Sequence, residues 1–266
     1  MRDEREAALE AIAGEVRECT RCRLHEGRTR AVPGEGDADT EVVFVGEGPG
    51  MNEDRDGRPF VGRAGGMLVR LLASVGWQRD DVFITNVVKC RPPDNRDPQP
   101  DEIAACAPYL RRQLAVLDPA VVVTLGRYSM GGFIPGARIG QAHGTIHPVD
   151  PETGAANALV FAMYHPAAAL RSPGVERDSF TDMANVPSVL LRARELRAAT
   201  AGTRRAADGR TGGASAGPAD ATMASGTDAA QTAARSAPIT APAPVSEPAI
   251  AAAELAADDA SQLTLF

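Results

Sequence analysis

The sequence has no long apolar run, few aromatic residues and almost no lysine. No stretch approaches the ~18 consecutive apolar residues that a membrane span requires. The N-terminal segment is charged and lacks the apolar centre of a signal peptide. We therefore expect a cytoplasmic protein without a membrane partner, whose four cysteines do not form disulfides.

The sequence also has fewer basic residues than acidic residues, 28 against 35. The net charge is −7, and Lys89 is the only lysine among 28 basic residues. The charge of the whole chain therefore gives no sign of a polyanionic partner. Any contact with DNA would need a local group of arginines, because only the cations that line a groove neutralise phosphates.

Residues 200–266 lack the apolar side chains of a folded domain. Phe266 is their only aromatic residue, and Ala, Gly, Thr, Ser and Pro dominate. Such a composition buries too little apolar surface to offset the entropy of an ordered chain. The sequence therefore predicts one folded domain over residues 1–198, a disordered linker over 199–261 and a short motif at 262–266.

Short apolar runs alternate with helical patterns in the predicted domain. Strands of four to eight apolar residues between helices are typical of a parallel sheet covered on both faces. We therefore expect a three-layer α/β/α fold with a four-stranded parallel sheet. The predicted strands are residues 41–46, 81–88, 120–126 and 158–166, and the main predicted helices are residues 3–18, 64–75, 101–116 and 178–197.

Polar residues follow the predicted strands, where folds of this class bind their ligands. They are Glu47, Asn86, Arg127 and His165. Asn86 pairs either with backbone or with a ligand such as a base edge, because a buried unpaired amide costs about 1–3 kcal/mol. His165 is either an ordinary satisfied histidine or a catalytic group.

The glycine-rich stretch GEGPGMNED, residues 46–54, follows the first strand but does not fit a nucleotide. A dinucleotide fingerprint would need glycine where Met51 stands, and a P-loop would need a Gly-Lys-Ser/Thr sequence that is missing. Glu47 would also repel a phosphate. Downstream, Phe60 lies on a second glycine-rich loop, as either a core residue or a stacking platform.

The four cysteines are Cys19, Cys22, Cys90 and Cys106. They are either small core residues or thiolate ligands. As ligands they would suit zinc or an iron–sulfur cluster, and the spacing leaves that choice open. Either metal would tie the N-terminal helix to the loop after the second strand and to the next helix.

Three stretches resemble one family. GEGPGMNEDRDGRPFVGRAG, TNVVKCRPPDNRDP and YHPAAALR, with the cysteine spacing between them, are similar to the family 4 uracil-DNA glycosylases, the iron–sulfur branch of that superfamily. The resemblance implies an enzyme of base excision repair, which we expect to be a monomer associated with the nucleoid. Such an enzyme flips deoxyuridine out of single- or double-stranded DNA and hydrolyses its N-glycosidic bond, leaving an abasic site.

The resemblance also implies ligands and roles for individual residues. Cys19, Cys22, Cys90 and Cys106 would hold a [4Fe-4S] cluster. Phe60 would stack on uracil, Asn86 would read its polar edge, and His165 would stabilise the departing base. Glu47, Glu53 and Asn95 would line the pocket with Gly48, and they would position the water or crowd the methyl group of thymine, with Glu47 and Asn95 as the catalytic candidates. Arg171, in a DNA-inserting loop, would contact phosphate.

The chain ends in SQLTLF, which resembles the bacterial sliding-clamp-binding peptide. Gln262, Leu263, Leu265 and Phe266 would be its anchors in an apolar groove of the clamp. The predicted linker would reach roughly 45 Å as a coil, which would keep the domain at a raised effective concentration near replicating DNA.

Two other classes of function compete with the enzyme. One is a protein that traps uracil covalently through a histidine in a basic loop after the second strand, but residues 89–100 contain no histidine. The other is a cluster-bearing DNA-binding scaffold without chemistry. The joint presence of Glu47, Asn86 and His165 argues against the scaffold.

Overall fold

The computed structural model describes residues 2–211, and residues 1 and 212–266 lie outside the described part. Contacts divide the chain into a unit of Met1–Ala207 and a unit of Asp208–Phe266. Every candidate residue of the predicted domain lies in the first unit. Residues 212–261 of the predicted linker and the predicted motif at 262–266 lie outside the described residues.

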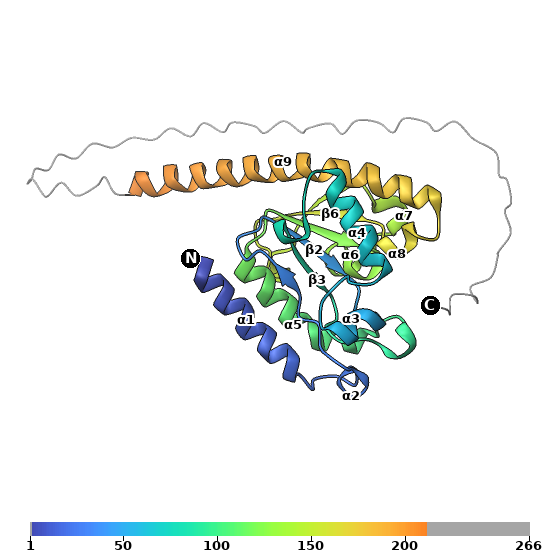
Figure 1. The fold of residues 1–266 in the computed structure, drawn as a ribbon. Coiled ribbons are helices and arrows are strands. Elements are labelled where there is room, and N and C mark those ends of the chain that lie inside the picture. The colour runs from blue at the N-terminus through green and yellow to red at the C-terminus, as the bar shows by residue number, and fades with distance from the viewer. Residues whose placement is uncertain (1, 212–266) are drawn as a thin grey trace, which may run out of the picture. The chain divides into compact units, whose positions relative to one another are not determined.

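A six-stranded sheet in the order β1-β3-β2-β4-β6-β5 forms the centre of the first unit (Figure 1). Its four central strands run parallel, and they are the four strands that the sequence predicts. Their bounds are β2 (Val42–Gly46), β3 (Phe83–Asn86), β4 (Val121–Leu125) and β6 (Leu159–Met163). The three-layer α/β fold is confirmed.

The sheet is mixed, however, because an antiparallel strand is added at each edge. These strands are β1 (Glu35–Gly36) and β5 (Ile146–Pro148), paired with β3 and β6. The expectation of a sheet with four strands only was therefore wrong. Each edge strand is two or three residues long and contains a glycine or a proline, so neither has the apolar run that predicts a strand.

Alternate side chains of the central strands face two separate cores. Val43 and Val45 of β2 pack with helices α1 and α5, whereas Val42 and Phe44 pack with α4 and α9. The helices are α1 (Arg2–Glu18), α4 (Arg63–Ser74), α5 (Pro100–Leu117) and α9 (Pro173–Thr211). Both faces of the sheet are therefore covered, which is why its strands are apolar throughout.

The shorter helical segments connect the strands to these helices. They are α2 (Leu24–Gly27), α3 (Met51–Asp56), η1 (Arg79–Asp81), η2 (Pro93–Asn95), α6 (Arg127–Phe133), α7 (Ile139–Ala142), η3 (Pro151–Thr153) and α8 (Pro166–Ala169).

Helix α9 is longer than the helix predicted at residues 178–197. It begins at Pro173, a residue that suits a first helical turn because its missing N–H has no partner to lose there. It ends at Thr211, so residues 199–211 of the predicted linker are helical. Among the described residues, no helix is both long and apolar enough to cross a membrane.

Candidate active site and cysteine-lined hollow

The parallel strands bring the predicted polar residues to one edge of the sheet. Gly46 of β2 pairs with Asn86 of β3, and Leu125 of β4 pairs with Met163 of β6. Glu47, Arg127 and His165 follow directly or within two residues of the ends of β2, β4 and β6. The polar side chains predicted from the sequence therefore lie together at this edge of the sheet.

Gly46 lets two of these side chains meet. A Cβ atom at this position would lie 2.6 Å from Cζ of Phe60 and still closer to Oδ1 of Asn86. Real Cβ atoms essentially never come so near, so only glycine fits. Phe60 and Asn86 therefore converge over the end of β2.

Phe60 is buried and holds an unusual backbone conformation. Its φ angle is +52°, and 6% of the residue is exposed. The left-handed region costs a residue with a side chain about 1–2 kcal/mol, so surrounding contacts must hold Phe60 there. Its ring centroid lies 5.7 Å from that of His165, with the two planes tilted by 30°. The two rings thus form adjacent walls of one site.

Asn86 has a buried side-chain oxygen that stands out in the described part of the chain. The residue is 1% exposed, and within residues 2–211 no hydrogen-bond partner reaches its Oδ1. Its backbone oxygen, in contrast, accepts from the buried ammonium of Lys89 at 2.9 Å. An unsatisfied buried acceptor costs about 1–3 kcal/mol. A ligand that donates a hydrogen bond would recover this free energy.

His165 is fixed in one tautomer. Its Nδ1 accepts a hydrogen bond of 3.1 Å from the backbone N–H of Ala167, so in the neutral ring the proton sits on Nε2. Burial, followed by the positive charge of Arg171, lowers the pKa of His165 to about 4. The ring is therefore neutral near pH 7 and carries one N–H donor.

Gly126 makes room for this histidine. Its φ angle is +89°, and a Cβ there would lie 2.9 Å from Cβ of His165. The turn between β4 and α6 thus needs glycine for its conformation and for the close approach of His165.

Glu47 is partly buried among charged neighbours. Burial, and then the nearby charge of Asp97, raises the pKa of Glu47 to about 7, while Arg127 opposes the rise. Arg127 and Asp97 form an ion pair of 2.5 Å. Asp97 was not among the site residues predicted from the sequence, although it stands in the same proline-rich loop as Asn95.

Three other predicted pocket residues have other contacts in the structure. Glu53 accepts hydrogen bonds from the backbone N–H groups of Gly50, Val61 and Gly62. Asn95 is exposed, and its Oδ1 accepts from Nε of Arg91 at 2.7 Å. A Cβ on Gly48 would lie 2.7 Å from Val88. Substrate or water contacts of these residues stay predictions.

The four cysteines surround one hollow. Cys19 and Cys22 lie at the end of α1 and before α2, Cys90 follows β3, and Cys106 lies in α5. Val16, Leu24, Val88 and Tyr109 complete much of the apolar wall. Segments up to 87 residues apart in the chain thus bring every thiol of the protein to one place.

Each thiol in this hollow also has an N–H group directed to it. Backbone N–H groups of Arg21, Leu24 and Lys89 donate to the sulfurs of Cys19, Cys22 and Cys106, and the guanidinium of Arg28 donates to Cys90. Hydrogen bonds to sulfur stabilise thiolate ligands. This donor set fits four thiolates that share the negative charge of a metal cluster.

Without metal, the three more deeply buried of these thiols would stay protonated. Burial raises the pKa of Cys22 and of Cys90, and it raises the pKa of Cys106 to about 11. Binding to a metal removes such protons. Within residues 2–211, no group of three or more His, Cys, Asp or Glu side chains has the arrangement of a site for a single metal ion.

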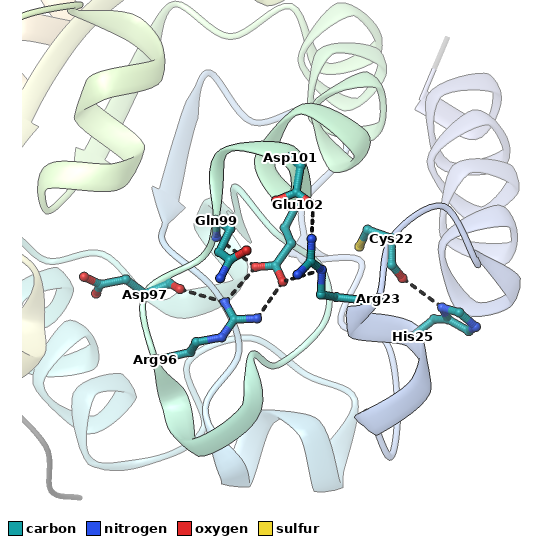
Figure 2. A network of polar contacts seen from close by, with 8 residues as sticks. All are labelled: Cys22, Arg23, His25, Arg96, Asp97, Gln99, Asp101 and Glu102. Atoms are coloured by element: carbon teal, nitrogen blue, oxygen red, sulfur yellow. Dashed lines mark hydrogen bonds and ion pairs between the residues drawn. The ribbon is translucent and has the colours of Figure 1, made fainter.

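A polar network joins two of the cysteine-bearing segments to the proline-rich loop (Figure 2). Arg23, next to Cys22, forms an ion pair with Asp101 at the start of α5. Glu102 is fully buried and accepts two hydrogen bonds from Arg96. The hydrogen bond from Arg96 is the largest cause that lowers the pKa of Glu102. The loop that carries Asp97 is therefore anchored to the wall of the hollow.

Comparison with known proteins identifies this arrangement. The profile of the uracil DNA glycosylase superfamily matches residues 33–186. This range contains all of the strand ends described above, and the chain belongs to that superfamily.

The relatives define the branch. A type-4 uracil-DNA glycosylase of Sulfurisphaera tokodaii is 48% identical over 64% of this chain and 79% of its own length. Those of Saccharolobus solfataricus and Thermotoga maritima are each 46% identical, over 68% and 63% of this chain and 86% of their own lengths. The chain is thus of the type-4 branch, whose members are hydrolases that excise uracil from DNA, and the rival scaffold and uracil-trapping interpretations fall away.

Proposed function

We propose that Phe60, Asn86 and His165 form the pocket that receives a flipped-out deoxyuridine. The unpaired buried Oδ1 of Asn86 beside the Phe60 ring carries the proposal. Uracil has an N3–H donor that suits this acceptor, and its flat ring suits the face of Phe60. Stacking on an aromatic side chain contributes about 1–3 kcal/mol per base. Because the target atom is hidden inside a duplex, the base must leave the stack first.

His165 stabilises the departing base. Cleavage of the C1′–N1 bond leaves the bonding electron pair on uracil, which departs as an anion. The neutral ring of His165 keeps its proton on Nε2, from which it donates to the oxygen where this charge develops. Such a hydrogen bond strengthens as the reaction proceeds and so stabilises the transition state more than the substrate.

Glu47 acts on the sugar side of the bond. Its carboxylate holds a water molecule against C1′, and its charge favours the oxocarbenium character that develops on the sugar. The water adds to C1′ and gives up a proton, and the uracil anion takes up a proton, so that free uracil and an abasic site result. Asn95 is the second candidate for holding this water, and Gly48 and Glu53 shape the wall of the pocket.

The loop after β6 contacts the DNA. Leu170 and Arg171 are exposed at the end of α8, and Leu170 is 39% exposed although it is apolar. Arg171 binds a phosphate of single- or double-stranded DNA, while Leu170 fills part of the gap that the flipped base leaves. The adjoining Ala167 and Ala168 are too small to do so.

The cysteine-lined hollow holds a [4Fe-4S] cluster on Cys19, Cys22, Cys90 and Cys106. The shared hollow and the N–H group aimed at each sulfur support this assignment. The cluster, when bound, joins α1 and α2 to the loop after β3 and to α5. Its proposed task is structural, because the reaction requires no electron transfer.

The enzyme acts as a monomer in the cytoplasm, on the nucleoid. Its domain of residues 1–198 is tethered through residues 199–261 to a sliding-clamp-binding motif at Gln262–Phe266. That motif lies outside the described residues and is supported by its sequence alone.

Excision from defined oligonucleotides tests the pocket. The purified protein is incubated with strands that contain one uracil or one thymine, and abasic sites are then cleaved with alkali. We expect cleavage at uracil in the native protein and a rate about 5-fold to 150-fold slower in Asn86→Ala, because removal of a bound polar partner costs about 1–3 kcal/mol. Native excision by Asn86→Ala, with folding intact, would refute the pocket.

A further inference from the structure

We propose that Arg79 and Glu53 are positioning residues that hold Phe60 in its stacking position from opposite sides. Nothing in the sequence motifs assigns Arg79 to the site, and Glu53 was expected to line the pocket directly. The proposal rests on the proposed role of Phe60 as the platform for uracil.

Phe60 needs external support, because its backbone is in the left-handed region with φ of +52°. A relaxed φ angle would turn the ring away from Asn86 and from His165, whose ring lies 5.7 Å away. The start of α4 also crowds the loop, since a Cβ on Gly65 would collide with the carbonyl of Phe60. Hydrogen bonds to the peptide groups on both sides of Phe60 would therefore hold its backbone in this conformation.

Glu53 fixes the peptide groups that follow Phe60. One carboxylate oxygen accepts from the N–H groups of Val61 at 2.9 Å and Gly62 at 2.8 Å. The other accepts from the N–H group of Gly50 at 3.1 Å. The carboxylate thereby joins the loop of Phe60 to the loop that carries Glu47. These three donors occupy both oxygens, which favours a positioning role for Glu53.

Arg79 fixes the carbonyl groups on the other side. Its guanidinium donates to the backbone oxygen of Phe60 at 3.0 Å and to that of Pro59. Its Nε donates to Glu35 at 2.7 Å, and 17% of the Arg79 side chain is exposed. A positive group thus binds the carbonyls up to Phe60, and a negative group binds the N–H groups after it.

Arg58 provides a matched control. It forms the same kind of bond to Glu35, at 2.7 Å, but its side chain is 59% exposed. The hydrogen bonds of Arg58 that the structure gives within residues 2–211 go to Glu35 and not to the carbonyls of Pro59 or Phe60. A change at Arg58 disturbs Glu35 without releasing Phe60, whereas a change at Arg79 does both.

A double-mutant cycle tests the inference. Uracil excision is measured for Arg79→Gln, Phe60→Ala and the double variant, with kcat and KM determined separately and folding checked by thermal unfolding. We expect Arg79→Gln to lower kcat/KM for uracil DNA at least ~10-fold, mostly through KM. In the Phe60→Ala background the same change should have less than a ~2-fold effect, because the group that Arg79 holds is gone. Arg58→Gln should stay within ~2-fold of the native enzyme.

Three outcomes separate the possibilities. An equal loss from Arg79→Gln in both backgrounds, or no loss in either, would overturn the inference. Native activity of Phe60→Ala would instead overturn the proposed role of Phe60. If Arg79→Gln does not fold, Arg79→Lys and Glu53→Gln replace it in the cycle. Arg79→Lys keeps the positive charge but cannot bridge both carbonyls. Each replacement should lower kcat/KM in the native background and have less than a ~2-fold effect in the Phe60→Ala background.

Discussion

Burial disfavours the charged forms of both Glu47 and His165, so it shifts the pKa values of the two side chains in opposite directions. Burial raises the pKa of Glu47 to about 7 and lowers the pKa of His165 to about 4. Near pH 7.5 the site therefore contains a carboxylate and a neutral imidazole. This combination suits a cationic sugar on one side and an anionic base on the other.

The excision rate should follow the ionisation of Glu47. We expect the rate to rise with pH, to reach half its maximum near pH 7 and to level off above pH 8. His165 stays neutral throughout this range, so it does not contribute to the profile. In Glu47→Gln the rate should fall by about 100-fold or more, and the profile between pH 5.5 and 8.5 should be flat. A native-like acid limb in Glu47→Gln would contradict the assignment.

The same pKa predicts a change in stability. The pKa of Glu47 is raised by folding, so its contribution to the free energy of unfolding is complete below pH ~4.5 and is lost as the pH rises through about 7. Glu47→Gln should therefore stabilise the protein at pH 8.5, by about 1–2 kcal/mol after allowance for partial exposure. The gain at pH 5 should be smaller. Urea unfolding at both pH values measures the difference, and an equal gain at both would refute it.

At the scale of elements, the ends of the strands decide where the chemistry lies. Apolar runs predict β2, β3, β4 and β6, and the parallel arrangement then predicts that Glu47, Asn86 and His165 meet. The edge strands β1 and β5 could not be predicted, because pairing with β3 and β6 rather than an apolar pattern makes them strands.

The supporting residues of the site were harder to predict than the strand ends. Arg79 contacts the carbonyls of residues 59 and 60, and Asp97 affects Glu47 from a different loop. Such contacts depend on side-chain placement between segments that are 19 to 50 residues apart in the sequence, and no local pattern encodes them. The hydrogen-bond partners of the Glu53 carboxylate could not be predicted either, because they come from two loops that meet only in the folded protein.

The end of β2 should tolerate no side chain. Gly46→Ala would push a methyl group into Oδ1 of Asn86 and into the ring of Phe60. We expect excision to slow by about 100-fold, the effect of a displacement near 1 Å in a catalytic geometry. Gly66→Ala is the control, because a Cβ there meets no atom of residues 2–211 within 4 Å. It should retain activity and gain up to ~1 kcal/mol of helix stability. Equal activities of the two variants would contradict the convergence over Gly46.

At the scale of the whole molecule, the cysteine-lined hollow connects the N-terminal helices to the sheet. Cys19 and Cys22 reach Cys90 and Cys106 across most of the first half of the chain. A cluster bound there would act as a cross-link. The network of Arg23, Asp101 and Glu102 supports the same junction through polar contacts.

Loss of one ligand should loosen this junction. In Cys106→Ala we expect the iron content and the visible absorbance to fall, and the free energy of unfolding to drop by about 2–4 kcal/mol, the range of a covalent cross-link that closes a long loop. Ala105→Ser, at the neighbouring position of the hollow, should retain iron and stability. Full iron content with native stability in Cys106→Ala would refute the proposed ligand set.

The central claim is that this site excises uracil by stabilising the anion that departs. The most direct measurement compares single-turnover release of uracil and of 5-fluorouracil by the native enzyme and by His165→Ala, with His147→Ala as the control. Fluorine stabilises the departing anion, so 5-fluorouracil needs less help from His165. We predict a loss of about 100-fold to 1,000-fold for uracil in His165→Ala, a clearly smaller loss for 5-fluorouracil, and no loss in His147→Ala. Equal losses for the two bases would contradict the account.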